Sequence, residues 1–222
     1  RRPFSTPNRA RNHNLEEQAQ ALFDSFVASD NGFGYHQLSE IAVINPARTL
    51  SKNTVARCID MSFLSTSGTF PSGWEYKPYS GGMKFQNGDT IMARITPCLE
   101  NGKAGYINFL DSNETAFGST EYIVLSAKEG YPSEMFYFLT RNADFIDYAV
   151  KNMNGSSGRQ RVSGETIGKY SLPVLTTKQL SDLQIHCSEA MKNICNNCLE
   201  NRLLMSTRDS LLPKLMSGEL TC

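Results

Sequence analysis

A long helical pattern near the end of the sequence constrains the fold most. Between residues 177 and 212, apolar side chains recur at intervals of three and four, the spacing of one face of an α-helix. A helix of about 36 residues, rising roughly 1.5 Å per residue, is on the order of 54 Å long. Because this exceeds the width of a small domain, part of the helix must pack on something outside that domain.

A coiled-coil partner helix is the natural candidate for that contact. Asn197, Asn201 and Arg202 interrupt the apolar face, and polar residues in such a seam can set register or partner choice. Pro213 and Gly218 are expected to end the helix. The residues expected to face a partner helix or a second copy of the chain are Leu180, Leu183, Cys187, Met191, Ile194, Cys198, Met205 and Leu212.

The segment 85–125 has the character of a sheet. Runs at 90–95 and 121–125, with a shorter one at 105–109, are rich in Ile, Thr, Tyr and Val and are bounded by Gly, Asn and Pro, as strands are. Further short strands are expected at 56–61 and 170–174, a one-turn helix at 38–42 and an amphipathic helix over 132–150. The order of elements predicts an α/β (α+β) globular domain with a mixed twisted sheet, to which the long coiled-coil-type helix is attached.

The N-terminal residues predict a second, shorter helix at 14–27. Asn14 suits its cap and Glu17, three residues later, would complete a capping box. The first fourteen residues hold four Arg and no acid, and we expect a solvated tail there. Two Gly between residues 29 and 35 mark a boundary. The expected organisation is a tail with a spacer-type helix (1–30), a globular domain (31–175) and the long helix (176–222).

Composition narrows the function. The 222 residues include 22 Lys plus Arg and 22 Asp plus Glu, so no overall field attracts nucleic acid or a membrane, and any basic binding face must be local. No apolar run approaches the roughly 18 residues of a membrane helix, and no secretory segment begins the sequence, so a cytoplasmic location is expected.

The cysteines and the known catalytic motifs give no sign of chemistry. Six Cys at irregular spacing suggest reduced thiols. Cys195 and Cys198 form a C-x-x-C that could bind zinc, but the helical periodicity around them favours buried small side chains, so neither a metal nor another cofactor is expected. The sequence lacks the phosphate loop, the dinucleotide-binding glycine pattern, the zinc-protease motif and the nucleophile elbow. We therefore expect a protein without catalytic activity.

Two loops could carry a binding surface. Residues 151–162 include Lys151, Arg159 and Arg161 with no acid, and their Gly residues would let backbone N–H groups and Arg side chains approach phosphates or base edges. This favours a nucleic-acid face over a plain hairpin loop. Residues 65–82 mix aromatic and basic side chains, which could lie on a nucleic acid or pack the loop onto the core.

Four segments stand out: ARITPCLENGK (93–103), AFGSTEYIVL (116–125), GSSGRQRV (155–162) and LLPKLMSGEL (211–220). Together they resemble the specificity subunit of type I restriction-modification systems, and NLEEQAQALFDSF (14–26) is similar to the end of that family's spacer helix. The resemblance implies a subunit without catalytic activity, in which two target-recognition domains joined by two antiparallel helices each read half of a bipartite DNA site. It also implies that methylation and restriction subunits bind around the helices. With one such domain and one long helix, this sequence resembles a half-subunit or the second half of a longer chain.

The resulting hypothesis places loops around 94–103, 118–121 and 154–161 in the major groove of double-stranded DNA. Arg and Lys would contact phosphate or guanine, and Asn and Gln would pair with adenine. Some of these residues, especially Thr96, Glu100, Ser119 and Thr120, could instead hold the loops through turn hydrogen bonds. A DNA methyltransferase fragment with its own recognition domain and a scaffold that binds no DNA remain as alternatives. The expected DNA-binding residues are Lys77, Lys84, Arg94, Thr96, Asn101, Lys103, Ser119, Thr120, Asn154, Ser156, Ser157, Arg159, Gln160 and Arg161.

Overall fold

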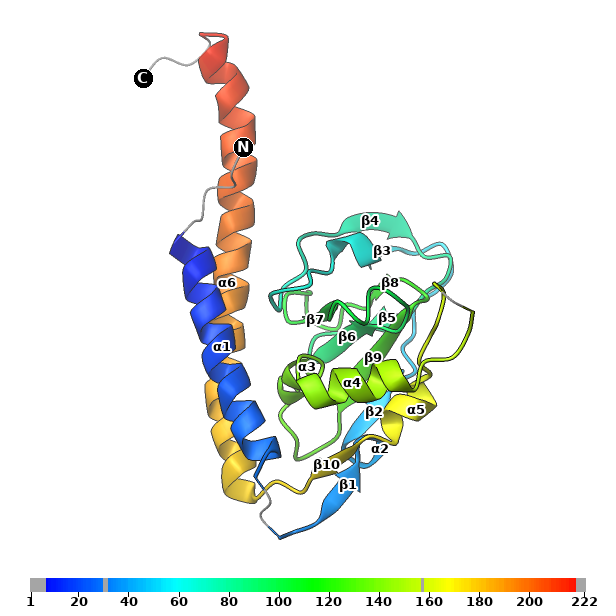
Figure 1. Ribbon diagram of the computed structural model, residues 1–222. Helices are drawn as coiled ribbons and strands as arrows, with labels where there is room; N and C mark the ends of the chain where they lie inside the picture. Colours follow the sequence, from blue (N-terminus) through cyan, green and yellow to red (C-terminus); the bar gives the residue numbers. More distant parts are fainter. Residues whose placement is uncertain (1–6, 30–31, 157, 219–222) are drawn as a thin grey trace.

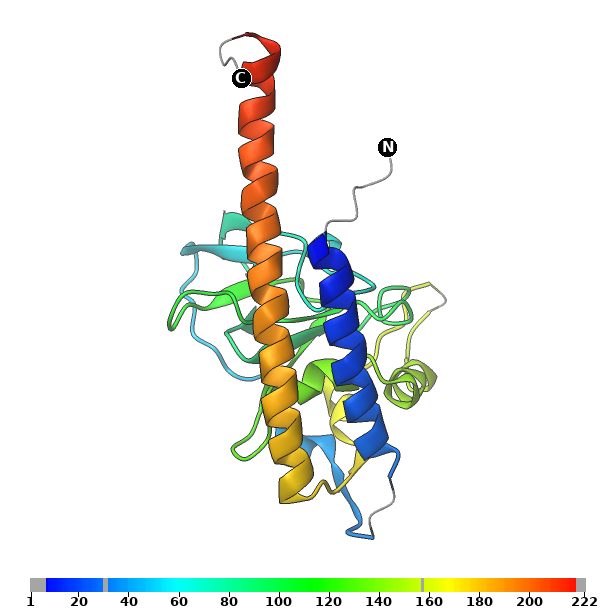
Figure 2. The same cartoon turned by 90° about the vertical axis from the view of Figure 1, so that its left-hand side faces the viewer.

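Two long helices lie along one side of the molecule, and a globular body packs on their flank (Figures 1 and 2). The computed structural model describes residues 7–29, 32–156 and 158–218. Helix α1 (Pro7–Val27) runs beside the first half of helix α6 (Thr177–Met216), and the second half of α6 projects beyond it (Figure 1). The chain between these helices forms the body.

Helix α6 confirms the long helical pattern and extends past its expected end. It begins with a capping box, in which the Thr176 hydroxyl accepts from the Gln179 N–H at 3.2 Å and the Gln179 side chain accepts from the Thr176 N–H at 2.9 Å. Pro213 does not end the helix, so that expectation is wrong: the Ser217 N–H still donates to the Pro213 carbonyl at 2.9 Å. The helix ends at Met216, just before Gly218, whose φ of 75° is the left-handed conformation typical of a helix end.

Helix α1 begins at Pro7, so the expected cap at Asn14 is wrong and part of the expected tail is helical. Proline suits the first helical position, and the added turns are held by α6. The Asn12 amide donates to the Cys198 thiol at 3.3 Å and accepts from Asn197 at 2.7 Å, and Asn8 donates to Glu200 at 2.8 Å. These long-range bonds explain why local pattern alone placed the start too late.

The body contains two four-stranded sheets and a two-stranded ribbon, which confirms the mixed α and β class. One sheet is antiparallel, in the order β2-β9-β6-β7, and Ile91 pairs with Val124 at its centre. The other has the order β4-β3-β8-β5 and includes the parallel pair β3 and β8, with Cys58 opposite Phe117. The strands are β1 (Tyr35–Gln37), β2 (Ala42–Ile44), β3 (Val55–Ile59), β4 (Glu75–Pro78), β5 (Lys84–Phe85), β6 (Asp89–Ala93), β7 (Ala104–Tyr106), β8 (Ala116–Gly118), β9 (Tyr122–Ala127) and β10 (Ser171–Pro173).

The expected helix over 132–150 is in fact two helices. The Asn142 side chain accepts from the Phe145 N–H at 3.1 Å and so caps a new helix. All five residues of the preceding helix are buried, because it crosses the body between α1 and the antiparallel sheet. The shorter helices are α2 (Leu38–Ile41), the 3-10 turn η1 (Met61–Phe63), α3 (Met135–Leu139), α4 (Ala143–Lys151) and α5 (Gly164–Gly168).

The antiparallel sheet is buried on both faces. Ile123 and Leu125 point into a core shared with α1, α3 and α6, whereas Tyr122 and Val124 point into a second core that contains Ile59 of the other sheet. A strand buried on both sides reads as a continuous apolar run, as 122–125 does. The ends of β6 and β9 are thereby fixed on a rigid base.

Candidate nucleic-acid interface

Three segments that are far apart in sequence meet at the end of β6 and the start of β9. The Arg94 N–H donates to the Glu121 carbonyl and the Val162 N–H donates to the Arg94 carbonyl, both at 3.0 Å. Thr96 and Gln160 exchange two bonds: the Thr96 N–H donates to the Gln160 carbonyl at 3.1 Å, and the Gln160 N–H donates to the Thr96 hydroxyl at 3.2 Å. The loops expected around 94–103, 118–121 and 154–161 therefore form one continuous surface.

The 154–161 segment is a closed hairpin. Asn154 and Arg161 exchange backbone hydrogen bonds at 2.9 and 2.8 Å. Gly155 has a φ of 127°, and a Cβ there would lie 3.0 Å from the Arg159 carbonyl oxygen, so the turn requires glycine. Asn154, Ser156 and Arg159 are exposed on this hairpin. Ser157, also expected to bind DNA, lies outside the described residues.

Arg161 is held by an ion pair with Glu121. Its Nε lies 2.9 and 3.0 Å from the two carboxylate oxygens and its Nη2 lies 2.7 Å from one of them. Hydrogen bonds from Arg161 lower the pKa of Glu121 below its usual range. The remaining nitrogen, Nη1, donates to the Arg159 carbonyl at 3.3 Å. The sequence analysis named Arg161 as an expected DNA contact, but it did not foresee that Glu121 neutralises it.

Two of the other expected cations are also engaged by the protein. The Lys103 ammonium donates to the Met61 carbonyl at 3.1 Å. Lys77 lies 2.8 Å from Asp60 and 2.6 Å from Glu75, and hydrogen bonds to these carboxylates raise the pKa of Lys77. Their geometry gives both lysines a role in holding strand ends and loops together.

Three cations are less committed. No side-chain hydrogen bond of Arg159 is found within the described part of the chain. Lys84 lies 5.6 Å from the centre of the Tyr79 ring. Arg94 is half-buried; its Nε is buried and has no hydrogen-bond partner among the described residues, so only its Nη atoms could meet a ligand. Lys84, Arg159 and this end of Arg94 remain available for a phosphate or a base.

The small polar residues divide between the two expected roles. The Ser119 hydroxyl accepts from the Glu121 N–H at 3.1 Å, so Ser119, like Thr96, holds its loop in place. Thr120 and Asn101 are exposed. The backbone N–H of Asn101 donates to the Pro97 carbonyl at 3.0 Å, which fixes the turn and leaves the amide side chain at the surface.

The 65–82 loop packs onto the protein through most of its aromatic side chains. Trp74 stacks on Phe109 with ring centres 4.9 Å apart, and the Arg202 guanidinium of α6 lies 3.8 Å from the Trp74 ring centre. Tyr79 meets Phe117 edge to face at 5.2 Å. Only Tyr76 is largely exposed among these aromatic residues. The choice left open by the sequence is decided for Trp74 and Tyr79, which pack on the core.

The apolar seam of α6 also needs correction. Leu183, Cys187, Met191 and Ile194 are at most 2% exposed, because α1 and the body cover them. Their partner is therefore this chain and not a second helix from outside. Leu180 and Cys198 are half-buried against the same surfaces. The apolar residues that remain exposed on α6 are Ile185, Leu199, Leu203, Leu204, Met205, Leu211, Leu212, Leu215 and Met216.

Cys195 and Cys198 do not form a metal site in the described part of the chain. Cys195 is buried in the second core, and burial raises the pKa of Cys198 to about 11, which favours the protonated thiol. Within residues 7–29, 32–156 and 158–218, no group of three or more His, Cys, Asp or Glu could hold a metal ion. The same residues include no helix that is both long and apolar enough to cross a membrane.

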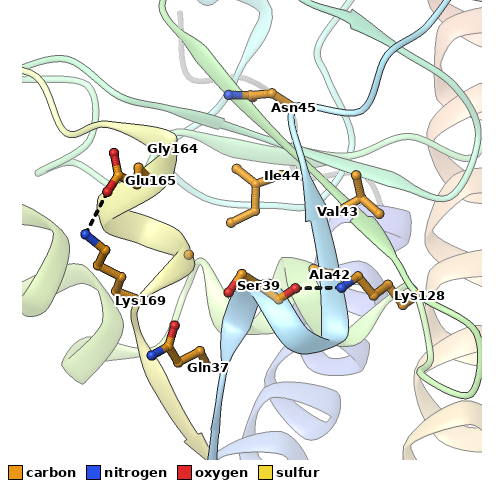
Figure 3. A pocket seen from close by; sticks show the side chains of 11 residues that line it. Gln37, Ser39, Ala42, Val43, Ile44, Asn45, Lys128, Gly164, Glu165 and Lys169 are labelled. Carbon is orange, nitrogen blue, oxygen red and sulfur yellow. Dashed lines mark hydrogen bonds and ion pairs between the residues drawn. The ribbon is translucent and has the colours of Figure 1, made fainter.

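A pocket of about 550 Å³ lies between β2 and α5 (Figure 3). Its charged side chains are bound within the chain: Lys169 lies 2.7 Å from Glu165, and Lys128 donates to the Ser39 carbonyl at 2.7 Å. Because these groups are engaged, they leave no free charge to select an ionic ligand. No motif in the sequence pointed to this pocket.

No protein-family model matches the chain, but individual proteins are similar to it in sequence. It is 26% identical over 197 residues to the type I restriction enzyme EcoAI specificity subunit of Escherichia coli, an alignment that covers 86% of this chain and 33% of that protein. It is 28% identical over 148 residues to the EcoEI specificity subunit of the same organism, covering 64% of this chain and 25% of that protein. The chain thus spans a third or less of these curated relatives.

Solved structures share the fold. The HsdS subunit from Thermoanaerobacter tengcongensis aligns with a TM-score of 0.51 at 10% identity, over 96% of this chain and 54% of that one. The type I restriction-modification S subunit from M. genitalium aligns with a TM-score of 0.52 at 16% identity, over 94% of this chain and 57% of that one. At such identities the likeness concerns the fold alone. In sequence the chain is similar to type I restriction enzyme specificity subunits, and its fold matches about half of a solved subunit of that kind.

Proposed function

We propose that this chain reads one half of a bipartite DNA target as a sequence-recognition component of a type I restriction-modification complex. The observation that carries the proposal is the meeting of three loops at the ends of two inner strands, β6 and β9. Those loops include 93–103, 116–125 and 155–162, three of the five segments that resemble specificity subunits. A surface of this kind presents side chains to a ligand with little loss of conformational freedom.

In this role Arg159 on the exposed hairpin reaches guanine O6 and N7, and the amides of Asn101 and Gln160 suit adenine. The Asn154 amide also suits adenine, but it donates to the Asn152 carbonyl at 3.2 Å and would have to give up that bond. Lys84 and Arg94 contact phosphates, which position the domain without reading sequence. The body (31–175) is the recognition domain, and α1 and α6 are the spacer helices. The methylation and restriction subunits supply the chemistry in the cytoplasm, and this chain supplies none.

The proposal is tested by binding to a pool of random duplexes, with and without methylation subunits, followed by sequencing of the bound fraction. The wild-type chain should enrich one short motif. Arg159→Ala should cost about 1–3 kcal/mol and relax the preference at one base pair. Arg11→Ala, an equal loss of charge at an exposed site on α1, is the matched control and should leave the motif intact.

Other outcomes identify the rival functions. If no duplex is enriched under either condition, the chain is a scaffold and the proposed function is wrong. Methyl transfer by the purified chain alone would instead identify a methyltransferase.

We also propose that the far half of α6 pairs with a second copy of the chain. Helix α1 covers only the first half of α6, and Leu203, Met205 and Met216 beyond it are 67%, 51% and 81% exposed. A second α6 packed against this stretch would cover the same residues of both chains, as a two-fold contact requires. Light scattering should therefore give twice the chain mass of 24.7 kDa. A monomer at micromolar concentration would contradict this arrangement.

A further inference from the structure

We propose that Arg161 is a positioning residue and not a DNA contact: together with Glu121 it locks the 154–161 hairpin so that Arg159 is presented to DNA. This inference rests on the proposed recognition function and assigns different roles to two arginines that the sequence treats alike. Both lie in the same basic loop, two residues apart. The structure separates them by their partners.

The lock consists of one residue, Arg161, that joins three parts of the surface. The Arg161 guanidinium reaches Glu121 at the start of β9 through three contacts of 2.7 to 3.0 Å. Its Nη1 donates to the Arg159 carbonyl at 3.3 Å. Its backbone exchanges two hydrogen bonds with Asn154 across the hairpin. The base of the hairpin and the backbone of Arg159 are thus tied to a strand that is buried on both faces.

A direct DNA contact by Arg161 would require this lock to open. The guanidinium would have to give up a forked, charge-assisted interaction, which is the strong kind of ion pair. Glu121 would then face the DNA as a carboxylate without its main partner, and a phosphate would repel it. The paired arrangement keeps this part of the surface close to neutral and avoids that repulsion.

Arg159 has the opposite properties. Its backbone is held by the lock, and glycines stand at positions 155 and 158 on the same hairpin. Its side chain is exposed and makes no hydrogen bond or ion pair with the residues that the structure describes. A side chain that is free while its backbone is fixed can form a bidentate pair with guanine without first breaking an internal bond.

The two roles give different binding signatures. A contact residue lost to alanine removes one preference or about one unit of the salt slope. A positioning residue misplaces the whole hairpin, so several positions of the motif weaken together while the number of phosphate contacts stays the same. The effect of Arg161 must also depend on Glu121, because it acts through that carboxylate.

The experiment compares Arg161→Ala, Glu121→Gln, the double variant and Arg159→Ala, using the random duplex pool and then salt titration on the duplex that the wild-type chain selects. We expect Arg161→Ala and Glu121→Gln each to lower discrimination between selected and random duplexes on the order of tenfold, while the salt slope stays unchanged. The double variant should discriminate no worse than either single variant, because both act through the same ion pair. Arg161→Lys, which keeps the charge but not the fork, should recover part of the loss.

Glu121→Gln decides between the roles. If Arg161 reads DNA and Glu121 merely competes for it, this variant frees the arginine, so binding becomes tighter or the salt slope becomes steeper; either result overturns the inference. An additive double variant does so too. Glu121→Gln keeps an acceptor oxygen and should fold even if Arg161→Ala does not, which thermal unfolding monitors. Absence of wild-type binding to any duplex would instead reject the recognition function itself.

Discussion

At the scale of single residues, the partners of the charged side chains decide what each can do. The basic residues of the expected site look equivalent in sequence, yet Arg161 is paired with Glu121, Lys77 with Asp60, and Lys103 with the Met61 carbonyl. These partners lie 40, 17 and 42 residues away along the chain. A locally basic segment can therefore contain more structural than binding charges.

The Glu121–Arg161 ion pair should make part of the stability depend on acid pH. The pKa of Glu121 is lowered in the folded protein from the ordinary value of 4.5, chiefly by hydrogen bonds from Arg161. The stabilisation should be fully present above about pH 4.5 and should be lost as pH falls through the lower folded pKa. We expect Glu121→Gln to lower the thermal midpoint at pH 7, and the difference from wild type to shrink below about pH 4.5.

Arg161→Ala provides the control for this pH dependence, because it removes the same pair from the other side. It should flatten the acid response in the same way. Equal midpoints of wild type and Glu121→Gln at pH 7 would show that the ion pair adds nothing to stability.

At the scale of elements, the two halves of α6 differ in what they pack against. Its first half has a continuous buried face against α1 and the body, and its second half has exposed apolar side chains with an Arg202 contact to Trp74 at the junction. The capping box at Thr176 starts the helix, but tertiary packing on the first half contributes most of its stability, as for most protein helices.

The two halves should respond differently to the same substitution. Leu183→Ala removes a side chain that is 0% exposed and should destabilise the fold by about 2–5 kcal/mol. Leu203→Ala, at 67% exposure in the same helix, should change the unfolding free energy by no more than about 0.5 kcal/mol and should weaken the proposed dimer. Denaturant unfolding of the two variants, with light scattering of the second, measures both effects. Equal destabilisation by the two would contradict this division of α6.

At the scale of the whole molecule, the balance of charges limits how the proposed DNA contact can be made. The formal net charge is zero, and of the expected cations only Lys84, Arg94 and Arg159 are uncommitted on the loop surface. We infer that the chain itself neutralises few phosphates. In the proposed complex, the methylation subunits would make most of the phosphate contacts.

The salt dependence of binding tests this division. With each neutralised phosphate contributing about 0.9 to the slope of log affinity against log salt, the chain alone should give a slope of about −3 or less in magnitude. Adding methylation subunits should steepen it. A slope near about −8 for the chain alone, with tight binding, would contradict the idea that the other subunits carry the phosphate contacts.

The sequence by itself determined the elements whose signals are local. The period of α6, the apolar runs of β6 and β9, and the glycine-containing basic loop each depend on neighbouring residues, so their positions were predictable. The 154–161 loop of the candidate site was singled out by its basic, glycine-containing sequence, and the other two loops lie in segments that carry the family resemblance. The division of the 132–150 segment at Asn142 was not predictable, because a capping bond outweighed the local pattern. Nor was the early start of α1, because contacts with α6 hold its first turns.

Only the tertiary structure decided which of these residues are free. Burial of the α6 seam by α1, the stacking of Trp74 under Arg202, and the neutralisation of Arg161 by Glu121 all join residues far apart in the chain. Such contacts cannot be read from a single sequence. Charge and hydrophobicity are properties of a residue, whereas pairing and burial are properties of the fold. The surface first recognised as a set of basic and polar residues is therefore, in the structure, a small number of free side chains on a frame held by the others.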